Sequence, residues 1–216
     1  MLFASGLKVA ESVTAPGAGR KQTTGIAVLV LLAAIGALSG CGARPFNVKP
    51  RPSLGKPDYG ASGTLDGMGI QAQAITDEDY LYEIFDANLI QAGIYPVRIR
   101  ITNNGSDTVE LKRAKFGIKS GAGKPFKVVE GRRAYKRLIS YYELTLYSKD
   151  GYKRSLGDFE SHVLDTASPL ASGESRDGIL FFLVPADVAV ESGLTLEAAR
   201  MGKQARSDAT LELKLK

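Results

Sequence analysis

Asp158, Glu160 and His162 form the candidate catalytic or metal-binding set of this sequence. On a strand these three side chains would point to the same side, because successive residues alternate between the two faces. Two carboxylates and an imidazole can bind a divalent metal ion or act as an acid–base pair. Strand positions two apart lie about 7 Å from each other, however, and Phe159 and Val163 would face the core. We therefore expect an ordinary solvated strand face, with a small-ligand, metal-binding or hydrolytic module as the alternative.

No other motif favours an enzyme. His162 is the only histidine, so any histidine-based site must include it. The glycine-rich stretch Gly117–Lys124 resembles a phosphate loop but has Ile118 where that motif needs its first glycine, and Pro125 replaces the metal-binding hydroxyl. It predicts a hairpin tip instead. We expect neither a catalytic residue nor a bound metal or cofactor.

Charged residues are segregated along the chain. Residues 112–137 contain ten lysines and arginines against one acid, whereas residues 57–97 contain seven acids and no basic residue. A dense basic region attracts polyanions, and outside the cytoplasm these are anionic headgroups, lipopolysaccharide phosphates or an acidic protein face, not nucleic acid. The alternative is that the basic and acidic segments neutralise each other in the fold. The candidate contact residues are Lys112, Arg113, Lys115, Lys127, Arg132, Arg133, Lys136 and Arg137.

Five tyrosines lie in or just after that region. If exposed, they could stack on sugars or anchor a protein partner. Aromatic residues at strand spacing more often belong to the core, which is the alternative we expect. The five are Tyr135, Tyr141, Tyr142, Tyr147 and Tyr152.

The elements that must position these residues are mostly strands. Alternating apolar and polar residues, or short apolar runs, predict strands over 70–75, 97–101, 126–129, 142–146, 179–184 and 211–215. Asn103-Asn104-Gly105 predicts a turn before a return strand at Val109 and Leu111. A capping hydroxyl and carboxylates predict a helix over 77–89. A second short helix is expected over 186–200, and 132–139 is either a helical turn or a loop.

Many short strands separated by turns predict a single all-β antiparallel sandwich over residues 70–216. One stretch resembles a sequence pattern common in immunoglobulin-like domains of bacterial lipoproteins. It consists of Pro169–Ser175, then Gly178 and Phe182-Leu183-Val184-Pro185. In those domains a turn with glycine leads into a core strand that ends in Val-Pro. Ile101–Gly105 is similar to another of their turns. The resemblance implies an immunoglobulin-like sandwich and transfers no active site.

The N-terminal residues predict export. Arg20 and Lys21 precede the apolar run Ile26–Leu38, which describes a secretory signal and is too short for a comfortable bilayer span of about 20 residues. Leu38-Ser39-Gly40-Cys41 resembles the lipobox of bacterial lipoproteins. The resemblance implies cleavage between Gly40 and Cys41, diacylglycerol on the thiol, and acylation, for example with palmitate, of the new amino terminus. The alternative is a free or buried cysteine after a signal anchor.

The predicted organisation follows from that cleavage: a signal peptide over 1–40, a lipidated tether rich in proline and glycine over 41–69, and the sandwich over 70–216. Several acyl chains on Cys41 would anchor the protein stably. Gly42 follows the lipidated residue, and in enteric-type sorting an aspartate there favours the inner membrane. The resemblance therefore implies the periplasmic face of an outer membrane, or else the outer face of the cell membrane.

These observations predict a non-enzymatic lipoprotein that binds or scaffolds a component of the cell envelope, through an envelope protein or anionic headgroups. A second hypothesis is a secretion-apparatus lipoprotein with a transthyretin-like sandwich. The hydrolytic or metal-binding module at Asp158, Glu160 and His162 is the third.

Overall fold

The computed structural model describes residues 46–51, 57–144, 148–185, 188, 194–201 and 210–215. All of them belong to the second of the chain's two compact units, Pro45–Lys216. Cys41 and the predicted signal peptide lie outside the described residues. No helix in the described ranges is both long and apolar enough to span a bilayer.

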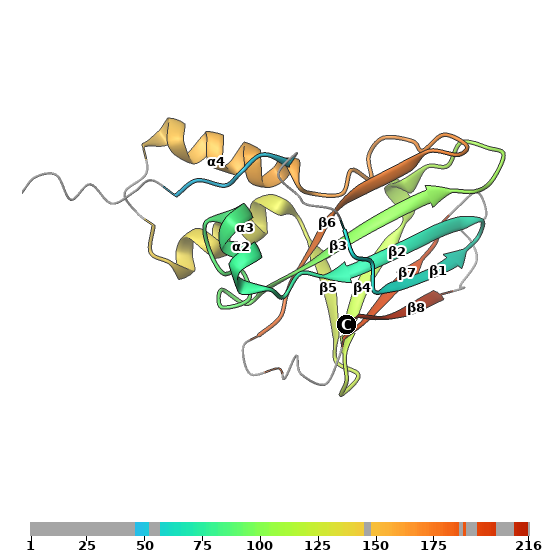
Figure 1. Cartoon of the computed structure of the whole chain (residues 1–216), viewed down its shortest axis with the longest axis horizontal. Coiled ribbons are helices and arrows are strands. Elements are labelled where there is room, and N and C mark those ends of the chain that lie inside the picture. The colour runs from blue at the N-terminus through green and yellow to red at the C-terminus, as the bar shows by residue number, and fades with distance from the viewer. Residues whose placement is uncertain are drawn as a thin grey trace, which may run out of the picture. The chain divides into compact units, whose positions relative to one another are not determined.

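Eight antiparallel strands form one sheet in the order β1-β2-β3-β6-β5-β4-β7-β8. The sheet folds over on itself, so that the two outermost strands, β1 and β8, contact each other (Figure 1). The predicted antiparallel sandwich is therefore confirmed. The strands are β1 (Ala61–Leu65), β2 (Met68–Ala74), β3 (Ile94–Asn103), β4 (Lys115–Ser120), β5 (Pro125–Val129), β6 (Ser175–Leu183), β7 (Leu194–Ala199) and β8 (Thr210–Leu215).

Two hydrophobic cores hold the fold together. The first lies inside the folded sheet and takes at least one buried side chain from every strand, such as Ile70, Ile99 and Leu196. The second lies between the sheet and three helices, where Phe85, Phe159 and Phe181 pack with ring centroids 4.7 to 6.1 Å apart. Alternation along β6 supplies both cores, because its successive side chains point to opposite faces.

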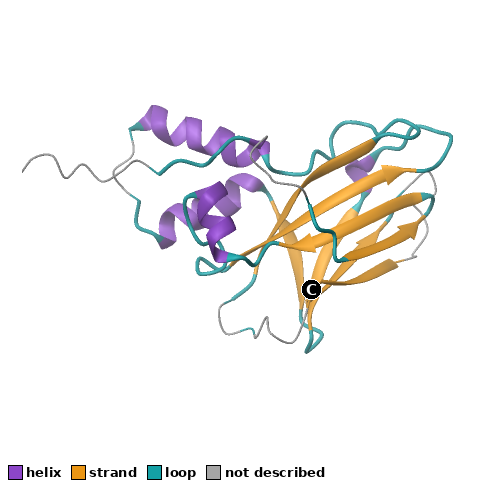
Figure 2. Ribbon diagram, viewed as in Figure 1, coloured by secondary structure: helices purple, strands orange, loops and turns teal. Residues whose placement is uncertain are grey.

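The helices gather at one end of the sandwich (Figure 2). They are α2 (Glu78–Phe85), α3 (Gly131–Tyr141) and α4 (Lys149–Ser161), and a short 3₁₀ helix covers Leu111–Arg113. The predicted helix in this region is confirmed, but its cap is the Asp77 carboxylate rather than a hydroxyl: Asp77 accepts a hydrogen bond from the Tyr80 N–H at 2.7 Å, and α2 begins at Glu78. It ends at Phe85 rather than Leu89, because Asp86 adopts the left-handed conformation. The helical alternative for 132–139 is the correct one.

Several predicted strands are confirmed, namely 70–75, 97–101, 126–129, 179–184 and 211–215. Others are wrong. Val109 makes only an isolated bridge to Leu170 and Leu111 begins the 3₁₀ helix, because β3 pairs with β2 and β6 rather than with a following hairpin strand. The described part of 142–146 is turn and loop after α3. The second predicted helix, over 186–200, is replaced at its end by β7.

The predicted tether is also wrong in extent. Its glycine-rich half contains β1 and the start of β2, joined by a two-residue turn at Asp66 and Gly67, both with positive φ. In its first half Phe46 and Val48 are buried in the helical core. The described residues 46–51 therefore form a segment docked on the domain, which we call the strap.

Candidate functional site

The structure does not bring the predicted catalytic set together. Asp158 and Glu160 lie in helix α4, and His162 caps the end of that helix. The strand face on which the hypothesis depended does not exist. Glu160 pairs instead with Arg132 at 3.6 Å. Within the described ranges, no group of three histidine, cysteine or acidic side chains is arranged to hold a metal ion.

His162 holds the strap. Its ring is fully buried, and the Nε2–H donates to the Lys49 carbonyl oxygen at 2.7 Å. The Nδ1 atom is buried without a hydrogen-bond partner among the described residues. Burial lowers the pKa of His162, and the nearby Arg51 and Arg98 act in the same direction against the Lys49 hydrogen bond and Asp158. The histidine is thus neutral and structural.

Further contacts fasten the strap along its length. The Lys49 N–H donates to the Ile84 carbonyl at 2.8 Å, and the Asn47 N–H donates to Asp86 Oδ2 at 3.0 Å. Phe46 packs near Tyr135 of α3, with 6.3 Å between ring centroids. The strap is therefore bound to α2, α3 and the end of α4.

A charged cluster lies on the outer face of the central strands. Asp177 of β6 accepts from Arg98 Nε and Arg100 Nη2, both at 3.1 Å, and from the Tyr59 hydroxyl at 2.5 Å. Arg100 also sits 5.4 Å above the Tyr59 ring. Burial alone would raise the pKa of Asp177, but these hydrogen bonds and guanidinium charges hold it below its ordinary value.

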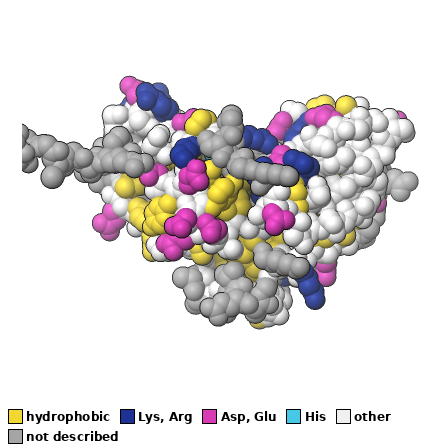
Figure 3. Space-filling model, viewed as in Figure 1, with side chains coloured by type: hydrophobic (Ala, Val, Ile, Leu, Met, Phe, Trp, Pro, Cys, Tyr) yellow, Lys and Arg dark blue, Asp and Glu magenta, His cyan; other side chains and the backbone are white. Residues whose placement is uncertain are grey.

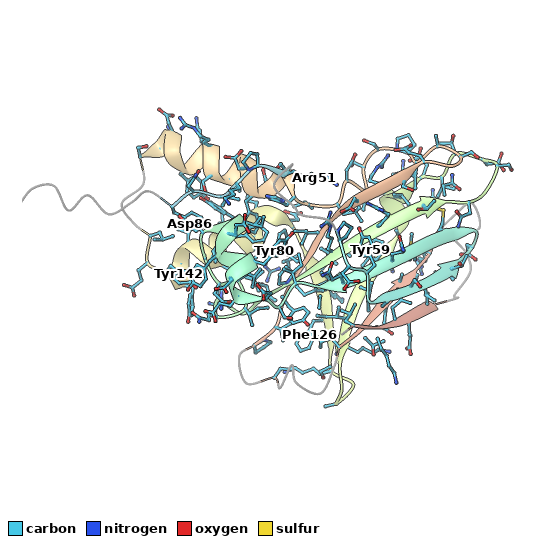
Figure 4. All side chains as sticks on the ribbon, viewed as in Figure 1. Arg51, Tyr59, Tyr80, Asp86, Phe126 and Tyr142 are labelled. Carbon is cyan, nitrogen blue, oxygen red and sulfur yellow. The ribbon has the colours of Figure 1, made fainter. Side chains whose placement is uncertain are left out.

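The Tyr59 hydroxyl in this cluster is partly buried and hydrogen-bonded, and both effects act on its pKa. Burial, followed by its hydrogen bond to Asp177, raises the pKa of Tyr59 to about 12. An adjoining hollow of about 690 Å³ is lined by Asp58, Gln73, Tyr80 and Arg98, among others; Figure 4 shows Tyr59 over the strands and Tyr80 on α2. Because Tyr59 is held by Asp177 and Arg100, and the Asp58 N–H donates to Gln73, we assign the cluster to holding residues 57–60 on the sheet.

A groove opens where β5 changes its pairing partner from β4 to β6. β5 pairs with β4 only through residues 125–127 and with β6 only through Val128 and Val129. Between these short ladders lies a groove of about 720 Å³ with apolar walls. Its apolar lining includes Phe116, Phe126, Val128, Leu164 and Leu180. We call this the seam groove.

Two of the predicted contact lysines lie at the seam groove. Lys115 and Lys127 line it together with Glu130 and Glu197. Glu197 is already paired with Lys119, and Lys124 lies 5.7 Å above the Phe126 ring. The rim therefore carries more positive than negative charge.

The other predicted basic residues are spread over separate elements. Lys112 pairs with Glu110 at 3.5 Å, and the Arg137 guanidinium donates to the Ala92 carbonyl. Arg133 and Lys136 are exposed on α3, while Arg113 is exposed on the 3₁₀ helix. Acidic side chains gather over α2 on the face in Figure 3. The eight residues do not form one patch.

The tyrosines divide between core and surface. Tyr135 is fully buried, Tyr152 packs against it, and Tyr141 is 45% exposed. The Tyr142 hydroxyl donates to the Asn88 carbonyl at 3.1 Å. Tyr147 lies outside the described residues. Sequence reasoning missed Tyr82 of α2, which is 43% exposed and hydrogen-bonds Tyr142.

Comparisons with known proteins add distant structural likenesses. No protein-family profile and no curated protein sequence matches this chain significantly. Solved structures that it resembles include the yjhA protein from Bacillus subtilis, at 11% identity and TM-score 0.40, covering 73% of this chain and 98% of that one. An apag protein from Pseudomonas aeruginosa is 16% identical, with TM-score 0.30 and coverage of 62% and 96%. An uncharacterised β-sandwich protein from Clostridium difficile is 14% identical, with TM-score 0.34 and coverage of 78% and 100%.

Proposed function

We propose that this protein is an extracytoplasmic lipoprotein, anchored through Cys41, that binds an envelope protein and catalyses no reaction. The anchor is supported by the Leu38–Cys41 pattern behind a basic and apolar leader. Confinement to one surface raises the effective concentration of the domain near its partner, so a modest contact is sufficient.

The observation that carries the binding function is the seam groove. Its lining includes the half-buried Phe116 and the exposed Val128. β5 pairs with β4 only at residues 117–119 of β4, so Lys115 and Phe116 lie beyond that short ladder, at the edge where an extended segment could add. A peptide can add to such an incomplete sheet through main-chain hydrogen bonds, while side-chain pockets give specificity. The positive rim favours acidic residues beside the apolar ones. The partner is therefore an extended protein segment that combines apolar and acidic side chains.

The test is photo-crosslinking in living cells from p-benzoylphenylalanine at Val128, which lines the groove and is 36% exposed. We expect a discrete protein adduct from Val128 and none from Gln71, an exposed control position on β2. Lys127→Glu should weaken that adduct, whereas Lys153→Glu on α4 should leave it unchanged. A lipid adduct, or equal adducts from both positions, would contradict the proposed groove.

The anchor is tested separately. Metabolic labelling with an alkyne-tagged palmitate should mark the protein and should fail for Cys41→Ser. Intact mass should also place the mature amino terminus at Cys41. A labelled Cys41→Ser variant would contradict acylation at this position.

A further inference from the structure

The strap fixes where the chain leaves the domain. Phe46 is bound at the end of the helical layer where α3 ends and α4 begins (Figure 1). Four side chains belong to that end: Tyr141 and Tyr142 at the end of α3, Lys149 at the start of α4, and Tyr82 of α2, which contacts Tyr142. We call this surface the helical tip. Tyr142 and Asp86 mark this end in Figure 4.

Covalent length limits how far the helical tip can stand from the anchor. This step rests on the proposed acylation of Cys41. Phe46 is the fifth residue after Cys41, and a fully extended chain spans at most about 3.6 Å per residue. Phe46 therefore lies within about 18 Å of the lipidated residue. A long flexible tether could have kept the domain clear of the membrane, but the docked strap removes most of that freedom.

The exposed residues of the helical tip suit a bilayer interface. Among the described residues, the large hydrophobic side chains that remain exposed are Tyr82, Tyr141 and Val128, and two of these three belong to the tip. Tyr141 and Tyr142 pack edge to face with centroids 4.9 Å apart, so the rings form a cluster rather than isolated positions. Tyrosine has an apolar ring and a polar hydroxyl, which favour the headgroup region of a bilayer.

We propose that the helical tip seats in the headgroup region of the phospholipid bilayer that carries the Cys41 anchor. The contact is made by aromatic rings rather than by general attraction to anionic lipid, because α2 also carries Glu78, Asp79 and Glu83. The seating is therefore insensitive to salt. It turns the helical layer toward the membrane and leaves the seam groove, which β4 and β5 line with neighbouring segments, for a protein partner.

The sequence contains no tryptophan, so a single introduced tryptophan reports on one position. The acylated full-length mature protein is reconstituted into vesicles of phosphatidylethanolamine and phosphatidylglycerol, with bromine on the upper acyl chains as a quencher. The Tyr141→Trp variant should lose most of its emission, and high salt should not restore it. The matched control Val128→Trp, at the seam groove, should keep its emission. Tyr82→Trp provides a second reporter from a different helix.

The outcomes separate this inference from the proposed function. If mass spectrometry shows acylated protein in the vesicles but neither tyrosine replacement is quenched, the seating is wrong and the anchor stands. Equal quenching at Val128→Trp also overturns it, since the domain would then have no preferred face. If Cys41 carries no acyl chain, the proposed function itself fails.

Discussion

At the scale of single residues, Asp177 joins the charged side chains on the outer face of the central sheet and therefore contributes to stability. It is 18% exposed and pairs with Arg98, which is 9% exposed. Removing one partner of a buried ion pair leaves an uncompensated charge, which costs about 3 kcal/mol. We expect Asp177→Asn to lower the unfolding free energy by about that amount.

Urea unfolding measures this loss. The matched control is Glu110→Gln, because Glu110 is 55% exposed and pairs with Lys112 at a similar distance of 3.5 Å. An exposed pair of this kind contributes little, so the control should change stability by less than about 0.5 kcal/mol. Equal effects from the two variants would show that burial of Asp177 is energetically irrelevant.

His162 makes stability depend on pH. Burial lowers its pKa from the ordinary 6.5, so the unfolded chain binds a proton before the folded protein does. The stabilisation is complete above about pH 6.5 and is lost as the pH falls through the folded pKa. We expect the unfolding free energy to decrease from pH 7.5 to pH 5.

His162→Gln is the informative variant, because a glutamine amide can still donate to the Lys49 carbonyl but does not titrate. Its unfolding free energy should be nearly flat over the same pH interval. Since His162 is the only histidine, a slope that persists in this variant would assign the pH dependence to carboxylates instead.

At the scale of elements, Gly178 sets the contact between β6 and the chain that follows α4. A Cβ atom at this position would lie 2.4 Å from the Leu164 Cα, and the backbone cannot move aside as a side-chain end can. We expect Gly178→Ala to cost about 3 kcal/mol of unfolding free energy. Thermal unfolding should show the drop directly.

Gly157 gives the opposite result from the same substitution. It lies in α4 and is exposed, and apart from its chain neighbours and the backbone of its own helix no heavy atom would lie within 4 Å of an added Cβ. Alanine favours a helix over glycine by about 1 kcal/mol, so Gly157→Ala should raise the melting temperature. A loss of stability in that variant would contradict the described path of α4.

Individual elements also explain which predictions from sequence succeeded. Val97, Ile99 and Ile101 alternate with polar residues, so the sequence alone predicted strand β3. Helix α4 was not, because Gly151 and Gly157 interrupt it and only Leu156 and Phe159 are large and fully apolar on its buried face. A signal existed in Ser148, whose hydroxyl caps the helix by accepting from the Gly151 N–H.

The β1–β2 hairpin was missed because glycines at 60, 63, 67 and 69 resembled a linker. Asp66-Gly67 is, however, a strong two-residue hairpin signal. The charged cluster and the seam groove required strand order. Arg100 lies opposite Asp177, 77 residues later, and local periodicity carries no information about that pairing.

At the scale of the whole molecule, the strap decides how mechanical load enters the fold. A pull on residue 41 against the C terminus reaches Phe46 first, and the strap is held by a few hydrogen bonds and two buried side chains. The sandwich behind it is joined by continuous strand ladders. Single-molecule stretching should therefore show a small early extension before the main unfolding event, at lower force in Val48→Ala; one undivided event would contradict it.

If Cys41 carries the proposed anchor, detachment of the strap lengthens the link between that anchor and the domain. An extended chain from residue 46 to residue 57 spans at most about 40 Å. The extended chain from Cys41 to Phe46 spans at most about 18 Å. The basic residues in that stretch each stand directly before a proline, at Lys49-Pro50, Arg51-Pro52 and Lys56-Pro57, which favours extended backbone. The docked strap, residues 46–51, thus holds chain length in reserve, which a pull on the N-terminal side of the domain would release while the sandwich stays folded.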